Sequence, residues 1–152
     1  MKEQLAHKLL LKQYCEQIIL QRIATAQQAM DDAQAAANQE GKSSAGDKYE
    51  TARAMSHLEK DMQARQLLAH QQDLNALRAI NVQVVCIAPA AGAFVRTSNN
   101  RFFIGAGLGR QVIDGETVIF LSPASPLAMQ LMKKKPGDEI EFKGKEKIIE
   151  VY

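Results

Sequence analysis

Apolar residues in the first half of the chain recur at the three- and four-residue spacing of a helix. One such stripe predicts a helix from about residue 2 to about residue 38; its clearest members are Ile19, Ile23, Ala26, Met30, Ala33 and Ala37. A second stripe predicts a helix from about residue 47 to about residue 79; it contains Met55, Leu58, Met62 and Ala69. Glycine and serine residues interrupt the pattern between residues 39 and 46. Because the connection is short, the helices should pair as an antiparallel hairpin of coiled-coil type.

The second half of the chain changes to the two-residue alternation of β-strands. Strands are expected over residues 82–87, 94–97, 101–104, 117–121, 139–142 and 147–151. Ser125 followed by Pro126 predicts the start of a short helix, because serine caps helices and proline suits the first helical position. The chain is therefore predicted to be an α+β protein with a small antiparallel sheet and one helix.

Composition changes at the same point as the pattern. All four prolines and all five phenylalanines follow residue 81, whereas the preceding part is rich in good helix formers. These changes predict two domains, a helical hairpin over residues 1–79 and an α+β domain over residues 80–152. The tip of the hairpin is expected near residues 39–50, and the helix that leads to it becomes rich in alanine. Small side chains let two helices lie close together, so this end should be thin.

Length and composition are those of a soluble protein. The chain has 152 residues, of which 46% are hydrophobic and 24% are charged. No apolar run reaches about 18 residues, the length that spans a bilayer. The N-terminus lacks the layout of a signal peptide, so we expect a cytoplasmic protein that does not bind membranes. The net charge of +2 is too small to predict a nucleic-acid binder.

The cysteines, histidines and methionines indicate packing rather than chemistry. Cys15 and Cys86 form no Cys-x-x-Cys motif, so both are expected to be buried or inert thiols. The three histidines have no zinc-binding spacing. Four methionines are expected to fill the core: Met55, Met62, Met129 and Met132.

The candidate chemistry lies at the start of the second helix, where Asp47 and Glu50 stand three residues apart. Residues at this spacing share one face of a helix, so both carboxylates can point at a single site. Mg²⁺ prefers oxygen ligands and often takes only one or two carboxylates from a protein. The same spacing is that of a capping box, in which two side chains satisfy the first amides of a helix. Spacing alone favours the capping box.

Two separated motifs resemble the Gre family of bacterial transcript-cleavage and elongation factors. Residues 46–52 read Gly-Asp-Lys-Tyr-Glu-Thr-Ala and are similar to the tip of that family's hairpin, Gly-Asp-x-x-Glu-Asn-Ala. Residues 122–126 read Ser-Pro-Ala-Ser-Pro, and an amphipathic helix and Lys-Pro-Gly-Asp at 135–138 follow, which is similar to the family's C-terminal run. The resemblance covers essentially the whole chain, and the C-terminal motif is the more specific.

The resemblance implies a helical hairpin followed by an FKBP-like domain that docks on RNA polymerase. Four residues are implied to bind the polymerase: Ser122, Pro123, Ser125 and Pro126. The hairpin would enter the secondary channel of the polymerase and bring Asp47 and Glu50 to its active site. There the two acids would help to hold a second Mg²⁺ and a water, and hydrolysis at the 3′ end of the backtracked nascent RNA would follow.

Physical chemistry is consistent with a shared metal site. Phosphodiester hydrolysis benefits from two metal ions that clamp the attacking and leaving oxygens. Two carboxylates alone should bind Mg²⁺ poorly, so RNA polymerase would supply the remaining ligands. The chain would then be an accessory factor that acts as a monomer, and not an enzyme by itself.

The chain departs from the Gre pattern beside the acid pair. Thr51 stands where the family has Asn, and Arg53 and Ala54 stand where it has an acidic residue and Tyr. These departures bear on RNA cleavage more than on polymerase binding. One alternative is therefore a channel-binding regulator that modulates transcription without cleavage. A plain coiled-coil interaction protein is another, and the FKBP-like fold leaves a prolyl isomerase as a third, which the absence of tryptophan disfavours.

Overall fold

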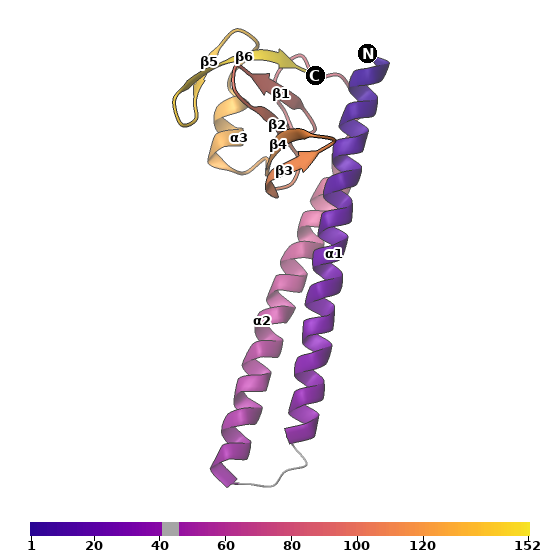
Figure 1. Cartoon of the computed structure of the whole chain (residues 1–152), viewed down its shortest axis with the longest axis vertical. Helices are drawn as coiled ribbons and strands as arrows, with labels where there is room; N and C mark the ends of the chain where they lie inside the picture. The colour runs from indigo at the N-terminus through magenta and orange to yellow at the C-terminus, as the bar shows by residue number, and fades with distance from the viewer. Residues whose placement is uncertain (41–45) are drawn as a thin grey trace. The chain divides into compact units, whose positions relative to one another are not determined.

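The computed structural model describes residues 1–40 and 46–152, without the side chains of residue 40 and of residues 46–49 (Figure 1). Two long helices come first, α1 (Lys2–Glu40) and α2 (Gly46–Ala79). Six strands and a short helix follow: β1 (Phe94–Thr97), β2 (Arg101–Ile104), β3 (Gly109–Ile113), β4 (Glu116–Leu121), α3 (Pro126–Leu131), β5 (Glu139–Glu141) and β6 (Lys145–Val151). This order confirms the predicted α+β class. Among the helices of these described ranges, none has an apolar stretch of the length that a membrane span requires.

The described residues divide into two compact units. The hairpin unit contains residues 17–74, which are the larger parts of α1 and α2. The sheet unit contains residues 1–16 and 75–152. The beginning of α1 and the end of α2 therefore belong to the same compact unit as the strands and α3.

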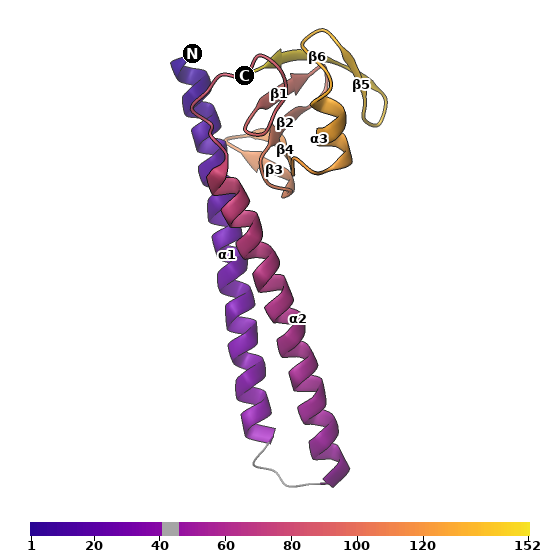
Figure 2. The ribbon, with the colours of Figure 1, turned by 180° about the vertical axis from the view of Figure 1, so that it is seen from behind.

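In the hairpin unit, α1 and α2 lie side by side in both views of the molecule (Figures 1 and 2). The predicted stripe of α1 faces inward, because Ile19, Ala26 and Ala33 are buried and the other stripe residues are half-buried. Both helices begin and end within two residues of the predicted limits. The predicted helical hairpin is confirmed.

The predicted apolar face of α2 is wrong. Met55 and Leu58 are 65% and 66% exposed, and Met62 is 45% exposed. The inward face is turned by one residue, about 100° around the helix; it contains Ala52, Ser56, Lys60, Gln63, Leu67, His70 and Leu74. Polar side chains can occupy this face because they bond across the hairpin, as Lys60 Nζ does when it donates to Gln34 Oε1 at 2.7 Å.

The strands form one sheet in the order β3-β4-β2-β1-β6-β5. The prediction of an antiparallel sheet is wrong at one place, because β2 and β4 are parallel, with Phe102 opposite Ile119. The reason is β3, a strand that the alternation did not reveal. It forms a hairpin with β4 through Asp114 and Gly115, both of which have positive φ. This hairpin places β4 beside β2 and running in the same direction.

The strand expected over residues 82–87 is also wrong, since this segment has no regular structure. A side chain of α1 binds one of its carbonyl groups in place of a neighbouring strand, because Lys8 Nζ donates to the carbonyl oxygen of Val84. Just before the segment, Lys12 Nζ donates to the carbonyl oxygen of Ile80 at 2.6 Å. The β-branched composition reflects burial of single side chains, such as Val82, rather than pairing.

Apolar residues pack on both faces of the sheet. Helix α3 covers one face, where the core consists of Val95, Phe102, Ile104, Ile119, Ala128, Leu131, Ile140 and Ile148. The beginning of α1 covers the other face. There the His7 ring centroid lies 4.8 Å from that of Phe94, and Tyr14 stacks on Phe120 at 6.0 Å.

The methionines agree with the expected packing role at one position only. Met132 packs against the core beneath α3, as predicted. Met129 of α3 is half exposed, and the prediction is wrong for it as it is for Met55 and Met62. Flexible and polarisable side chains at the surface are typical of contact surfaces as well as of cores.

Candidate functional sites

The predicted acid pair lies at the beginning of α2. Since α2 begins at Gly46, the backbone of both Asp47 and Glu50 is helical, and the two residues share a face. Glu50 is exposed. The side chain of Asp47, and with it the predicted metal site and the capping-box alternative, lies outside the described residues.

The next residues of α2 set the charge around Glu50. Thr51 and Arg53 are both exposed, and Arg53 follows Glu50 by three positions, which places it on the same side of the helix. A guanidinium three residues away on the same side of a helix opposes the attraction of a carboxylate for a cation. Among the residues with described side chains, no group of three or more His, Cys, Asp or Glu could hold a metal ion.

The predicted polymerase-binding residues form a turn that leads into α3. Ser125 caps this helix: its Oγ accepts from the backbone N–H of Ala128 at 3.3 Å and donates to the carbonyl oxygen of Ser122 at 2.8 Å. Ser122 Oγ in turn accepts from the N–H of Ala124 at 3.3 Å. Pro126 occupies the first helical position, as predicted. Both serine hydroxyls are thus engaged within the turn and shape it.

The outward face of α3 carries a shallow hollow of about 590 Å³ beside this turn. Five residues line it: Pro126, Met129, Gln130, Lys133 and Lys134. Pro126 and Met129 are exposed and apolar, and the two lysines add positive charge at the edge. Such a surface complements one that combines apolar and acidic groups. Met129 was expected to fill the core, so its place on this exposed surface was not predicted.

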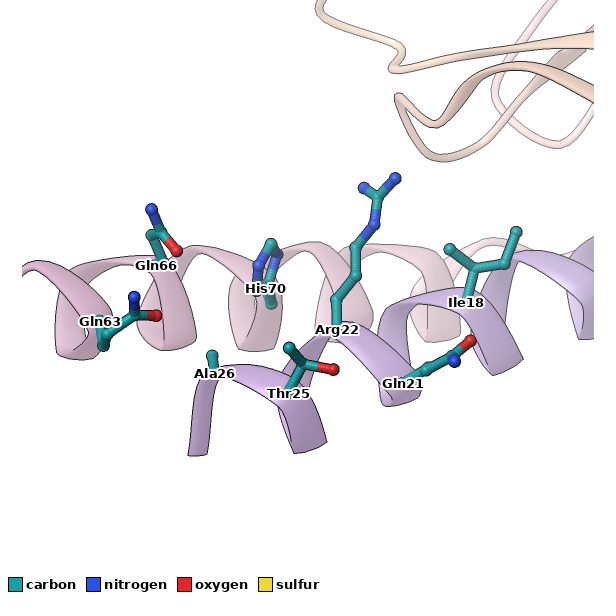
Figure 3. Close-up of a pocket in the computed structure, with 8 residues that line it drawn as sticks. All are labelled: Ile18, Gln21, Arg22, Thr25, Ala26, Gln63, Gln66 and His70. Carbon is teal, nitrogen blue, oxygen red and sulfur yellow. The ribbon is translucent and has the colours of Figure 1, made fainter. Parts of the chain in front are cut away.

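The hairpin unit has a second hollow, a polar groove of about 290 Å³ between α1 and α2 (Figure 3). Its lining residues come from both helices: Ile18, Gln21, Arg22, Thr25, Ala26, Gln63, Gln66 and His70. Figure 3 shows Arg22 rising from α1 and His70 on α2 among glutamine side chains. None of the site residues predicted from the sequence lines this groove.

Sequence reasoning also missed a buried amine. Lys8 is 0% exposed, and its Nζ donates to the Val84 carbonyl and lies 3.8 Å from the Sγ of Cys86. Burial lowers the pKa of Lys8, while Cys86 acts in the opposite direction. The only signal in the sequence is the four-residue spacing of Lys8 and Lys12, which puts both on the helix face that meets residues 80–86.

Comparisons of this chain with protein-family models, with curated proteins and with solved structures gave no match. The resemblance to the Gre family therefore rests on the segments 46–52 and 122–138 and on the order of hairpin and sheet.

Proposed function

We propose that the chain is a Gre-like transcription elongation factor that binds RNA polymerase through its secondary channel. It stimulates cleavage of backtracked nascent RNA by the polymerase. Its C-terminal α+β part is FKBP-like and docks on the polymerase, and the hairpin delivers the acid pair. The factor acts in the cytoplasm as a monomer and lends residues to the polymerase, so it is not an enzyme by itself.

One observation carries this proposal. Helix α2 begins at Gly46, the first residue of the Gre-like motif, so the motif stands where the second arm of the hairpin starts. Asp47 and Glu50 then share a helix face at that end. A second Mg²⁺ held by these carboxylates, by water and by groups of the polymerase would stabilise the attacking and leaving oxygens of RNA hydrolysis.

We infer that the exposed side of α3 is the docking surface. Ser122 and Ser125 hold the turn, while Pro126, Met129 and Lys133 present themselves outward. We assign the polymerase contact to this outward set, with Pro123 at its border. The serines contribute by fixing where α3 begins.

Stalled elongation complexes with Mg²⁺ test the proposal. Addition of the protein is expected to shorten the RNA, and a chain with both Asp47→Ala and Glu50→Ala is expected to bind without shortening it. Asp61→Ala is the matched control, because it removes an exposed acid from the same helix away from the motif. Loss of cleavage in all variants alike would contradict the assigned role of the acid pair.

Arg53 favours a second candidate, a channel-binding regulator that does not cleave. This exposed cation beside Glu50 opposes binding of a metal ion and can approach RNA phosphate instead. Binding to polymerase with an altered transcript pattern but full-length RNA would support this candidate. If purified polymerase neither binds the protein nor changes its products, both proposals fail and a plain coiled-coil interaction protein is left.

A further inference from the structure

Lys8 occupies an unusual environment in the sheet unit. Its side chain is completely buried, yet none of the salt bridges among the described residues involves it. Its Nζ has two partners, the carbonyl oxygen of Val84 and the Sγ of Cys86 at 3.8 Å. A buried ammonium without a carboxylate is costly, because it gives up hydration without an opposite charge in return.

This cost favours the uncharged amine. Burial lowers the pKa of Lys8, and Cys86 offsets only part of this effect. The neutral form of a lysine carries a lone pair and is a nucleophile, which is how desolvated lysines act in covalent catalysis. The sulfur of Cys86 lies 3.8 Å from this nitrogen and becomes an electrophile, which the amine can attack, once it is oxidised.

Cys86 is partly accessible to small reagents. It is half-buried, and the next residue, Ile87, is 90% exposed. The second thiol of the chain is not accessible in this way. Cys15 is completely buried, and burial raises its pKa to about 12. An oxidant should therefore reach Cys86 and spare Cys15.

We propose that Cys86 is a site of oxidation by hydroperoxides and that Lys8 captures the oxidised sulfur as a sulfenamide. In the first step, sulfur attacks one peroxide oxygen, the O–O bond breaks, and an alcohol or water leaves, which gives a sulfenic acid. In the second step, the amine of Lys8 attacks this sulfur. The S–N bond forms, the S–O bond breaks, and the hydroxyl leaves as water with one proton from the nitrogen.

The balance is a two-electron oxidation of the thiol by one molecule of hydroperoxide. A thiol reductant reverses it, because attack on the sulfur releases the amine and regenerates Cys86 after a mixed disulfide. The bond would fasten residues 80–86 to α1 at the point where Lys8 already holds the Val84 carbonyl. This modification is independent of the proposed role in transcription.

Mass spectrometry of the full chain after treatment with hydrogen peroxide tests the proposal. The expected product joins the peptide of Lys8 to that of Cys86, with the loss of two hydrogens, and dithiothreitol removes the link. Chain unfolded in urea should give at least about tenfold less of it, because the two groups are then no longer held together. Lys12, four residues away, and Cys15 are internal controls and should stay unlinked.

Lys8→Arg keeps the hydrogen-bond donors but replaces the amine with a guanidinium, which stays protonated and cannot condense in this way. In this variant the sulfenic acid of Cys86 should persist and be trapped by dimedone. Three results would overturn the proposal: oxidation of native Cys86 without a link to Lys8, linkage to Lys12 in equal yield, or an equal yield in urea. The comparison of native and unfolded wild-type chain holds even if the variant fails to fold.

Discussion

The Nδ1 of His7 lies 2.6 Å from the hydroxyl oxygen of Tyr152, which joins the beginning of α1 to the residue that follows β6. Phe94 packs against both rings, at centroid distances of 4.8 Å and 4.9 Å. The Nδ1 of a neutral imidazole can accept a hydrogen bond from the tyrosine hydroxyl here, whereas that of an imidazolium cannot. Burial lowers the pKa of His7 from 6.5; Glu116 opposes this effect and Arg101 reinforces it.

This contact predicts that the sheet unit loses stability in mild acid. Below pH 6.5 the unfolded chain takes up a proton at His7 that the folded chain resists. The free energy of unfolding should therefore fall as the pH is lowered from about 8 to about 5. Urea unfolding across this range measures the fall.

The glutamine variant His7→Gln separates this residue from the other titrating groups. It keeps a hydrogen-bonding side chain but cannot take up a proton. The dependence on pH should be weaker in His7→Gln than in the parent chain. An identical pH dependence in both would show that the contact with Tyr152 does not contribute.

A buried carboxylate gives a second prediction. Glu146 of β6 accepts from Thr97 Oγ1 at 2.7 Å and from Asn100 Nδ2 at 2.8 Å, which ties the turn between β1 and β2 to the neighbouring strand. Thr97→Val keeps the shape but removes one donor to a buried charged group. We expect a loss of about 1–3 kcal/mol in the free energy of unfolding. Thr117→Val, at a half-buried threonine of β4, is the control and should cost about 0.5 kcal/mol or less.

Some parts of the fold were predictable from a few neighbouring residues, because residue types such as serine and proline strongly favour particular backbone positions. The Ser125-Pro126 pair predicted the start of α3, and the alternation of apolar residues predicted the strands over 94–97 and 101–104, which pair with Phe94 opposite Phe103. Helix limits were predictable for the same reason, because glycine and serine interrupt the helical pattern between α1 and α2.

Features that depend on distant partners were not predictable. The parallel pairing of β2 with β4 follows from β3, whose residues Gly109–Ile113 are mostly exposed and show no apolar alternation. Residues 82–87 have strand-like composition, but Lys8 of α1 binds the carbonyl oxygen of Val84. The metal-binding role of the predicted acid pair depends on the side chain of Asp47, which lies outside the described residues. This role therefore stays a prediction.

The inward face of α2 gives a third prediction, built on one substitution at two positions. Leu58 is 66% exposed and Leu74 is 7% exposed, although the sequence analysis placed Leu58 in the buried stripe. Leu58→Ala should change the free energy of unfolding by about 0.5 kcal/mol or less. Leu74→Ala should cost about 2–5 kcal/mol, because it leaves a cavity between the helices. Equal losses on thermal or urea unfolding would contradict the inward face of the structure.

The outward face of α3 gives the last prediction, which separates docking from folding. Met129→Glu puts a negative charge into the hollow that Lys133 and Lys134 border. It leaves the core residues of α3, Ala128 and Leu131, unchanged. Affinity for RNA polymerase should fall by about tenfold or more, as for the loss of a central contact residue. The free energy of unfolding should stay nearly unchanged. A titration of labelled protein with polymerase and a urea curve measure the two quantities.

Two further variants make this test specific to the site. Val112→Glu adds the same charge at a 63% exposed apolar residue of β3 and should leave polymerase affinity unchanged. Ser125→Ala removes the cap of α3 and should cost about 1 kcal/mol of stability, which Ser125→Asp should restore because aspartate also caps helices. If Val112→Glu weakens binding as much as Met129→Glu does, general charge repulsion explains the loss. The hollow beside Pro126 would then not be the docking surface.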